Sequence, residues 1–205
     1  MGFYDKHVLP RLLNLACGVK PVRRQRRKVA PEASGRILEI GIGSGLNLPF
    51  YDPGKVEKVW GLEPSPEMTA YAEKAARRYP FDVEFIGLPG EEIPLDDHSV
   101  DTVLVTYTLC TIPEATTALR QMKRVLKPGG QLLFCEHGRA PDETVRRWQD
   151  RINPTWRKIA GGCNLNRPIP ELIRQGGFRL DTLEAMYIPG IKALSFNYWG
   201  RAQPD

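Results

Sequence analysis

Gly41, Gly43 and Gly45 lie at alternate positions directly after an apolar stretch, and an acidic residue, Glu39, precedes them by two positions. A glycine-rich turn after a strand brings backbone N–H groups and the N-terminus of a following helix against a bound ligand, because glycine accepts positive φ and adds no side chain. The dinucleotide pattern Gly-x-Gly-x-x-Gly would require a glycine where this chain has Leu46. The loop therefore indicates a ligand other than a pyrophosphate.

A second acidic residue, Glu63, follows Gly41 by 22 residues and ends the next apolar run. A carboxylate at this place can accept hydrogen bonds from both hydroxyls of a ribose. NAD enzymes share this device, so Glu63 does not choose between the cofactors that contain an adenosyl group. An ordinary strand-end carboxylate is the alternative reading. Together, the loop and Glu63 predict an adenosyl ligand.

Apolar runs of strand length alternate with helical stretches after residue 35, which is typical of strand-helix-strand units with a mainly parallel sheet. The expected strands cover residues 36–40, 58–63, 83–86, 100–106 and 131–136, and the expected helices cover residues 66–78, 114–126, 142–153 and 170–175. Ser65 as N-cap and Pro66 at the first position support the first of these helices. Residues 178–187 and 194–202 predict two closing strands, paired as a hairpin at one edge of the sheet.

Basic residues are concentrated at the start of the chain. Residues 1–31 hold eight of the 29 lysines and arginines but one of the 24 acidic residues. Apolar side chains of the same stretch recur at helical spacing, at Phe3, Tyr4, Val8, Leu9, Leu12, Leu13 and Leu15. We therefore divide the chain into a basic amphipathic arm, residues 1–31, and one globular domain, residues 32–205. The arm is either a solvated helix or a peripheral contact with an anionic membrane; without a nucleic-acid motif beside it, nucleic acid is disfavoured.

The four cysteines, Cys17, Cys110, Cys135 and Cys163, form no close pairs in the sequence. No Cys-x-x-Cys or short Cys/His spacing predicts a zinc site, so we expect no metal. We interpret the cysteines as reduced thiols of a cytoplasmic protein, and a catalytic cysteine is disfavoured because no activating partner is evident.

Three motifs in order resemble the class I methyltransferases that depend on S-adenosylmethionine (SAM): the glycine loop, EPS at 63–65 and LKPGG at 126–130. The resemblance covers about residues 35–140 and implies an α/β fold, a Rossmann-like three-layer sandwich with a seven-stranded, mostly parallel sheet and a C-terminal antiparallel hairpin. It implies SAM as cofactor, with the glycines along its methionine part and Glu63 at its ribose. The cofactor contacts that we expect are Glu39, Gly41, Gly43, Gly45, Asn47, Glu63, Pro64, Ser65, Met68, Gly90, Glu91, Thr106 and Leu109.

A further series resembles the methyltransferase-like seven group, membrane-associated animal proteins that methylate small alkyl thiols. It consists of NLPFY at 47–51, TYTLCT at 106–111, EH at 136–137, NPTW at 153–156 and GCNLNR at 162–167. The animal proteins begin with a hydrophobic anchor, where this chain has the basic arm. The resemblance implies a small lipophilic thiol as methyl acceptor. The residues expected to line its pocket are Tyr4, Thr108, Trp156, Asn164 and Arg167.

Methyl transfer from a sulfonium needs an aligned acceptor and the exclusion of water, because the cofactor already carries the activated carbon. A thiol must also lose its proton. His137 and Tyr107, at strand ends that face the ligand crevice, are the candidate catalytic residues. A histidine satisfied by the backbone or by Glu136 is the alternative for His137. Competing functions are lipid or quinone methylation at the inner membrane surface, and SAM binding without catalysis.

Overall fold

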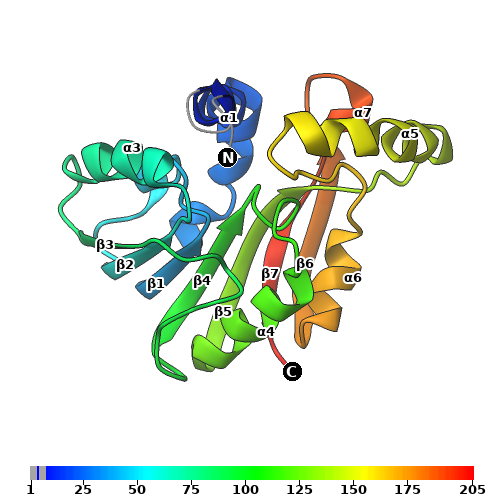
Figure 1. Cartoon of the computed structure of the whole chain (residues 1–205). Coiled ribbons are helices and arrows are strands. Elements are labelled where there is room, and N and C mark those ends of the chain that lie inside the picture. Colours follow the sequence, from blue (N-terminus) through cyan, green and yellow to red (C-terminus); the bar gives the residue numbers. More distant parts are fainter. Residues whose placement is uncertain (1–3, 5–7) are drawn as a thin grey trace.

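The computed structural model describes residue 4 and residues 8–205, which build one seven-stranded sheet in the order β3-β2-β1-β4-β5-β7-β6 (Figure 1). The strands are β1 (Gly35–Ile40), β2 (Val56–Leu62), β3 (Asp82–Ile86), β4 (Val100–Thr106), β5 (Leu126–His137), β6 (Phe178–Tyr187) and β7 (Phe196–Pro204). Strands β1 to β5 pair in parallel, while β7 runs antiparallel to both β5 and β6. The predicted sheet and its C-terminal hairpin are confirmed.

Helices cover both faces of the sheet. They are α1 (Leu9–Gly18), α2 (Lys20–Arg26), α3 (Pro66–Ala76), α4 (Ala115–Val125), α5 (Glu143–Ile159), α6 (Ile169–Gln175) and α7 (Lys192–Ser195), with 3-10 turns η2 (Ala30–Glu32) and η3 (Leu48–Phe50). Because successive strand side chains point to opposite faces, Leu38 joins the core under α4 and α6, whereas Ile37 joins the core under α3 and η2. With one core on each face, the sheet is the middle of three layers, and helices form the outer two.

Several predicted boundaries are wrong. Strand β5 begins at Leu126 rather than at residue 131, so residues 126–130 belong to the strand. Helix α5 does not end at residue 153 but continues through Pro154 to Ile159. Pro154 lies on the exposed face, where water can satisfy the carbonyl that the missing N–H leaves free. The last strand begins at Phe196 rather than at residue 194, because Lys192–Ser195 form a helical turn that reverses the chain.

The segment after the glycine loop is a 3-10 turn, η3, and not the α-helix that commonly follows a glycine-rich turn. Pro49 and Pro53 explain the difference, because two prolines within five residues remove the donors that an α-helix needs. Backbone groups of the loop therefore face the ligand crevice without a helix behind them.

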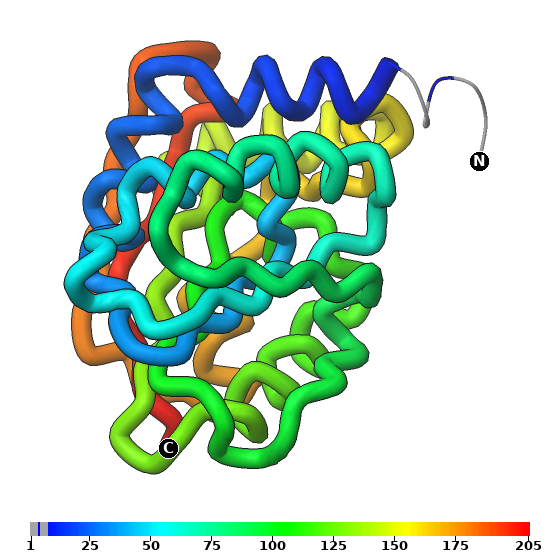
Figure 2. The backbone as a smooth tube through the Cα atoms, turned by 90° about the vertical axis from the view of Figure 1, so that its left-hand side faces the viewer, coloured from blue at the N-terminus to red at the C-terminus, as the bar shows by residue number. Residues whose placement is uncertain are grey.

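The N-terminal arm crosses the carboxyl ends of the strands. Helix α1 lies there in Figure 1, with α5 and α7 at the same end, and Figure 2 shows it running along that end of the molecule. At one side, Ser44 of the glycine loop donates a hydrogen bond from Oγ to Asn14 Oδ1 at 2.6 Å. At the other side, the Tyr4 hydroxyl donates to the carbonyl of Ile159 at 2.7 Å. Phe3, which the helical pattern included, lies outside the described residues.

Within residues 4 and 8–205, no helix combines the length and apolarity needed to cross a membrane.

Candidate active site

The glycine loop and Glu63 lie side by side at the carboxyl ends of β1 and β2. Strand pairing sets Ile40 beside Leu62, so the next residues of each strand emerge together. The loop glycines have φ of +67°, +57° and +78°, and a Cβ on Gly41 would lie 2.4 Å from the Thr108 side chain. Gly41 is therefore required both by its backbone conformation and by the close approach of the turn after β4.

The Glu63 carboxylate is fixed by two backbone donors. Its Oε2 accepts the N–H of Gly43 at 3.0 Å, and its Oε1 accepts the N–H of Ser65 at 3.0 Å. Partial burial raises the pKa of Glu63, and the two N–H groups oppose this shift. Ser65 is the N-cap of α3, as predicted, since its Oγ accepts the N–H of Met68. An oriented carboxylate with remaining acceptor capacity thus borders the loop.

Glu39, two residues before the glycine loop, is part of a buried polar network. Its Oε1 accepts the Asn47 Nδ2–H at 2.8 Å and its Oε2 accepts the Tyr51 hydroxyl. The same amide nitrogen also donates to Thr106 Oγ1 at 2.9 Å. Burial raises the pKa of Glu39 to about 7, against the two hydrogen bonds and the nearby Arg26. Glu39 therefore orients Asn47 and Tyr51 at the strand ends.

Arg26, on α2 of the arm, is also part of this network. It is 5% exposed and donates from Nη1 to Asn47 Oδ1 at 3.2 Å and to Thr106 Oγ1. Its guanidinium carbon lies 5.1 Å from the centre of the Tyr107 ring. Within the described part of the chain, its Nε is buried without a hydrogen-bond partner. A buried guanidinium with a free donor is costly unless an acceptor binds there.

The sequence did not single out Arg26 as a site residue, because its charge was counted together with the other basic residues of the arm. The signal was present, since Val22, Arg26 and Val29 recur at helical spacing and so share one face. Val29 is 2% exposed, and its neighbour Ala30 is fully buried. The boundary at residue 31 stays a prediction, but the last turn of the arm contributes to the site.

The turn after β4 is clamped by the carboxylate of Glu136 at the end of β5. Glu136 Oε1 accepts the N–H groups of Thr108 at 2.7 Å and Leu109 at 3.0 Å. Burial raises the pKa of Glu136 to about 6, although these donors oppose the shift. Tyr107 adopts φ of +55°, a conformation that is uncommon outside glycine. Such a clamp holds a strained turn at the crevice.

Tyr107 is placed for support rather than proton transfer. Its hydroxyl donates to Asn197 Oδ1 of β7 at 2.6 Å, and burial raises its pKa well above the usual value. Its ring stacks on His137 with centroids 6.4 Å apart. His137 Nε2 lies 3.2 Å from Cys163 Sγ, so its described partner is a thiol rather than Glu136 or the backbone.

The predicted pocket residues of the C-terminal third support the same turn. Asn164 donates from Nδ2 to the carbonyl of Cys110 at 2.9 Å, and Arg167 donates to the carbonyl of Leu109. Trp156 Nε1 is buried without a described hydrogen-bond partner. These side chains fix the shape of the acceptor side, and Tyr4 lies farther out at the end of α5.

Gly90 and Glu91 lie at the other side of the loop. A Cβ on Gly90 would meet Ile40 at 3.0 Å and Ile112 at 3.2 Å, which explains a glycine at this close approach. Glu91 Oε1 accepts the N–H of Glu114 at 3.2 Å. Both residues therefore lie near the ends of β1 and β4.

The structure brings together three potential metal ligands that the sequence spacing did not reveal. Cys110 Sγ, His137 Nε2 and Cys163 Sγ all lie within 4.8 Å of one another. The expectation of no metal site rested on the absence of short Cys/His spacings in the sequence. That argument does not hold in the folded chain, because the three residues lie at or shortly after the ends of three different elements, β4, β5 and α5.

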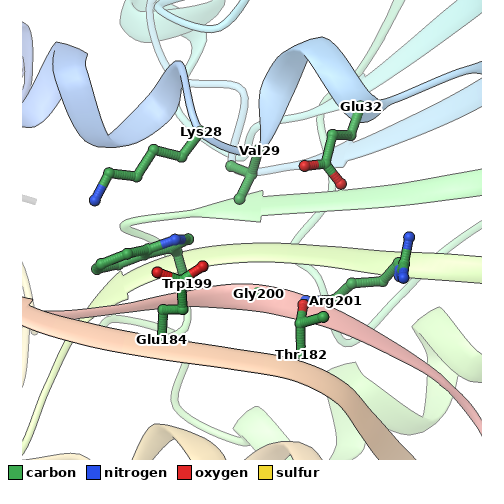
Figure 3. A pocket seen from close by; sticks show the side chains of 8 residues that line it. All are labelled: Lys28, Val29, Glu32, Thr182, Glu184, Trp199, Gly200 and Arg201. Atoms are coloured by element: carbon green, nitrogen blue, oxygen red, sulfur yellow. The ribbon is translucent and has the colours of Figure 1, made fainter.

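A separate hollow of about 530 Å³ lies between the arm and the β6–β7 hairpin (Figure 3). Lys28 from the arm lies above the ring of Trp199, with Nζ 3.2 Å from the ring centroid. Glu32, Glu184 and Arg201 also line it, so the charges are mixed. None of the residues of the glycine loop borders this hollow.

Comparison with known proteins assigns the family. Residues 38–134 match the methyltransferase domain model. Thiol S-methyltransferase TMT1B of Homo sapiens is 38% identical over 141 residues, which are 66% of this chain and 57% of that protein. The chain belongs to the class I SAM-dependent methyltransferases. It spans about three fifths of the length of this relative.

Two further matches bear on acceptor and fold. Phosphatidylethanolamine N-methyltransferase of Cereibacter sphaeroides is 30% identical over 117 residues, 55% of this chain and 57% of that protein. The crystal structure of a SAM-dependent methyltransferase of Thermotoga maritima, described as a possible histamine N-methyltransferase, superposes with a TM-score of 0.68 at 22% identity, covering 98% and 99% of the two chains. The structural match confirms the Rossmann-like fold, and the family's cofactor is SAM.

Proposed function

We propose that this methyltransferase transfers the methyl group of SAM to a small lipophilic thiol. The observation that carries the proposal is the 38% identity to a thiol S-methyltransferase over 141 residues, 66% of this chain. Bound SAM supplies a methyl group already activated on a sulfonium. The chain's own residues would then bind the cofactor, orient the acceptor and exclude water.

The strand-end residues fit the three parts of SAM. Backbone groups of the glycine loop, with no side chains in the way, would line the methionine part. The Glu63 carboxylate would accept the ribose hydroxyls, and Pro64, Ser65 and Met68 would flank the adenine with Gly90 and Glu91. The unpaired Nε of Arg26 would bind the carboxylate of the methionine part, because it is a buried cationic donor without a described acceptor.

The acceptor would enter beside Thr108 and His137, where the ends of β4 and β5 meet under α1. Helix α1, which contacts Ser44 through Asn14, and Tyr4, which contacts the end of α5, would exclude water from the crevice. Tyr107 would orient His137 through ring stacking, while its own hydroxyl stays bound to Asn197. No proton transfer by Tyr107 is needed.

A matched acceptor series tests the function. Hexanethiol, hexanol and hexylamine share one alkyl chain and differ in the nucleophile. With SAM present, we expect release of S-adenosylhomocysteine with hexanethiol and little with the other two. Equal rates for all three, or none with any thiol chain length, would remove the thiol proposal.

Aminophospholipid methylation is the second candidate, supported by the similarity to a phosphatidylethanolamine N-methyltransferase. Phosphatidylethanolamine vesicles replace hexanethiol in the same assay. Methylated headgroups without thioether product would favour this candidate over the first.

We also propose that the arm contacts an anionic membrane surface. On α1, Leu12 is 49% exposed and Leu15 is 70% exposed, and Ile191, which precedes α7, is 71% exposed. Helices α1 and α7 lie at the same end of the molecule (Figure 1), and the arm that contains α1 is rich in basic residues. Apolar groups beside cations suit an interface between headgroups and acyl chains.

Vesicle sedimentation tests this contact. We expect Leu15→Asp to lose binding to phosphatidylglycerol vesicles, while Leu183→Ser, at an exposed apolar position on β6, keeps it. Equal binding by both variants would refute the proposal.

A further inference from the structure

Two thiols and an imidazole converge at the acceptor side of the crevice. Cys110 belongs to the turn after β4, His137 ends β5, and Cys163 follows α5. Their Sγ and Nε2 atoms lie within 4.8 Å of one another, and His137 Nε2 is 3.2 Å from Cys163 Sγ. We infer that Cys110, His137 and Cys163 form a zinc site that leaves one coordination position open.

The donor set and its size suit zinc. Zinc prefers thiolate and imidazole ligands in tetrahedral geometry, with Zn–S near ~2.3 Å and Zn–N near ~2.0 Å. In such a tetrahedron the ligand atoms are roughly 3.5 to 3.8 Å apart. The spacing of 3.2 Å between His137 Nε2 and Cys163 Sγ, and the upper limit of 4.8 Å for the set, lie on either side of these values. Shifts of about an ångström or less in side-chain position would complete the site.

Backbone contacts hold the two thiols in place. The carbonyl of Cys110 accepts both the backbone N–H and the Nδ2–H of Asn164, each at 2.9 Å. Cys163 immediately precedes Asn164, so these bonds tie the two cysteines together. The backbone N–H of Cys163 donates to the carbonyl of Ala160 at 3.1 Å. Ligands that are fixed before metal binding raise metal affinity.

The cluster lies next to the methyl-transfer side. Thr108, two residues before Cys110, contacts the position where a Cβ on Gly41 would lie, so the cluster adjoins the glycine loop. Catalytic zinc sites keep three protein ligands and one exchangeable ligand. In this site the acceptor thiol would be the fourth ligand, a step that rests on the proposed function, whereas the three-residue site does not.

Zinc binding would prepare the thiol for transfer. The thiol releases its proton to solvent on coordination, because a coordinating thiol is deprotonated. The thiolate sulfur then forms a bond to the methyl carbon while the methyl–sulfonium bond breaks. That electron pair stays on the cofactor sulfur, which leaves S-adenosylhomocysteine and a neutral thioether. A thioether is a weaker ligand than a thiolate, so the product leaves and the position reopens.

Metal analysis of the full chain tests the site. The protein is purified from zinc-supplemented cells, dialysed against metal-free buffer and measured by mass spectrometry for zinc per chain. We expect one zinc per chain, with loss in Cys110→Ala, His137→Ala and Cys163→Ala. Cys17→Ser is the matched control and should keep its zinc. Calorimetric SAM binding, retained in all four variants, shows that the variants are folded.

Cobalt supplies a second readout. Co²⁺ in place of zinc should give thiolate charge-transfer absorption and the strong visible bands of a tetrahedral ion. Hexanethiol should shift these bands and hexanol should not. Metal-free wild-type protein that binds neither ion, or a Cys110–Cys163 disulfide found by mass mapping of the protein as purified, would overturn the proposal. A zinc-loaded protein that methylates no thiol would instead refute the proposed function and leave the metal site standing.

Discussion

Replacing Arg26 by alanine should weaken SAM binding through the loss of one specific contact. The guanidinium is 5% exposed, and its Nε is the buried donor that we assign to the cofactor carboxylate. A hydrogen bond to a charged group contributes about 1.5 to 3 kcal/mol, so the dissociation constant should rise roughly 10- to 150-fold. Arg24→Ala is the control, because Arg24 lies on the same helix but is exposed.

Decarboxylated SAM isolates the contact. It lacks the carboxylate and retains the sulfonium, the ribose and the adenine. Calorimetry should show that Arg26→Ala weakens binding of SAM and leaves that of the decarboxylated compound within about threefold, since a double-mutant cycle reports only the coupled pair. Loss of affinity for both ligands by the same factor would refute the assignment and reduce Arg26 to a structural role in the network with Asn47 and Thr106.

Further predictions concern the other strand-end residues. Glu63→Gln should raise the dissociation constant of SAM about tenfold, because an amide is a weaker acceptor for the ribose hydroxyls; calorimetry at pH 7.5 measures it. Gly41→Ala should lower the free energy of unfolding more than Gly43→Ala in urea titrations: both have positive φ, but the added Cβ lies 2.4 Å from a side chain in the first and 3.5 Å in the second. Stability should fall between pH 5 and pH 7 by about 2 kcal/mol, because the pKa of Glu39 is raised to about 7 in the fold, so the native state binds the proton that the unfolded chain releases near pH 4.5. Glu39→Gln should reduce this slope, and an unchanged slope would contradict the shift.

The fold was predictable because its signals are local. Alternating apolar runs, Ser65 with Pro66, and the glycines all act through nearby backbone, and the structure confirms the sheet and its hairpin. The errors also have local causes that the pattern could not weigh. Pro154 stays within a helix because its position is exposed, and Lys192–Ser195 form a helical turn before the last strand.

The site was less predictable because its decisive contacts are distant in sequence. Arg26 meets Thr106 across 80 residues, and His137 meets Cys163 across 26. Charge counting placed Arg26 with surface residues, although its spacing with Val22 and Val29 indicated a buried face. Cysteine spacing likewise carries no information on thiols that three separate elements bring together.

Transfer of an isotopic label tests the central claim most directly. SAM labelled with ¹³C in its methyl group is incubated with the protein and hexanethiol, and NMR follows the label. We predict that the label appears on the sulfur of methyl hexyl sulfide, one equivalent for each S-adenosylhomocysteine formed. SAM that binds, as calorimetry would show, while its label stays in place or moves only to amines, would contradict a thiol methyltransferase.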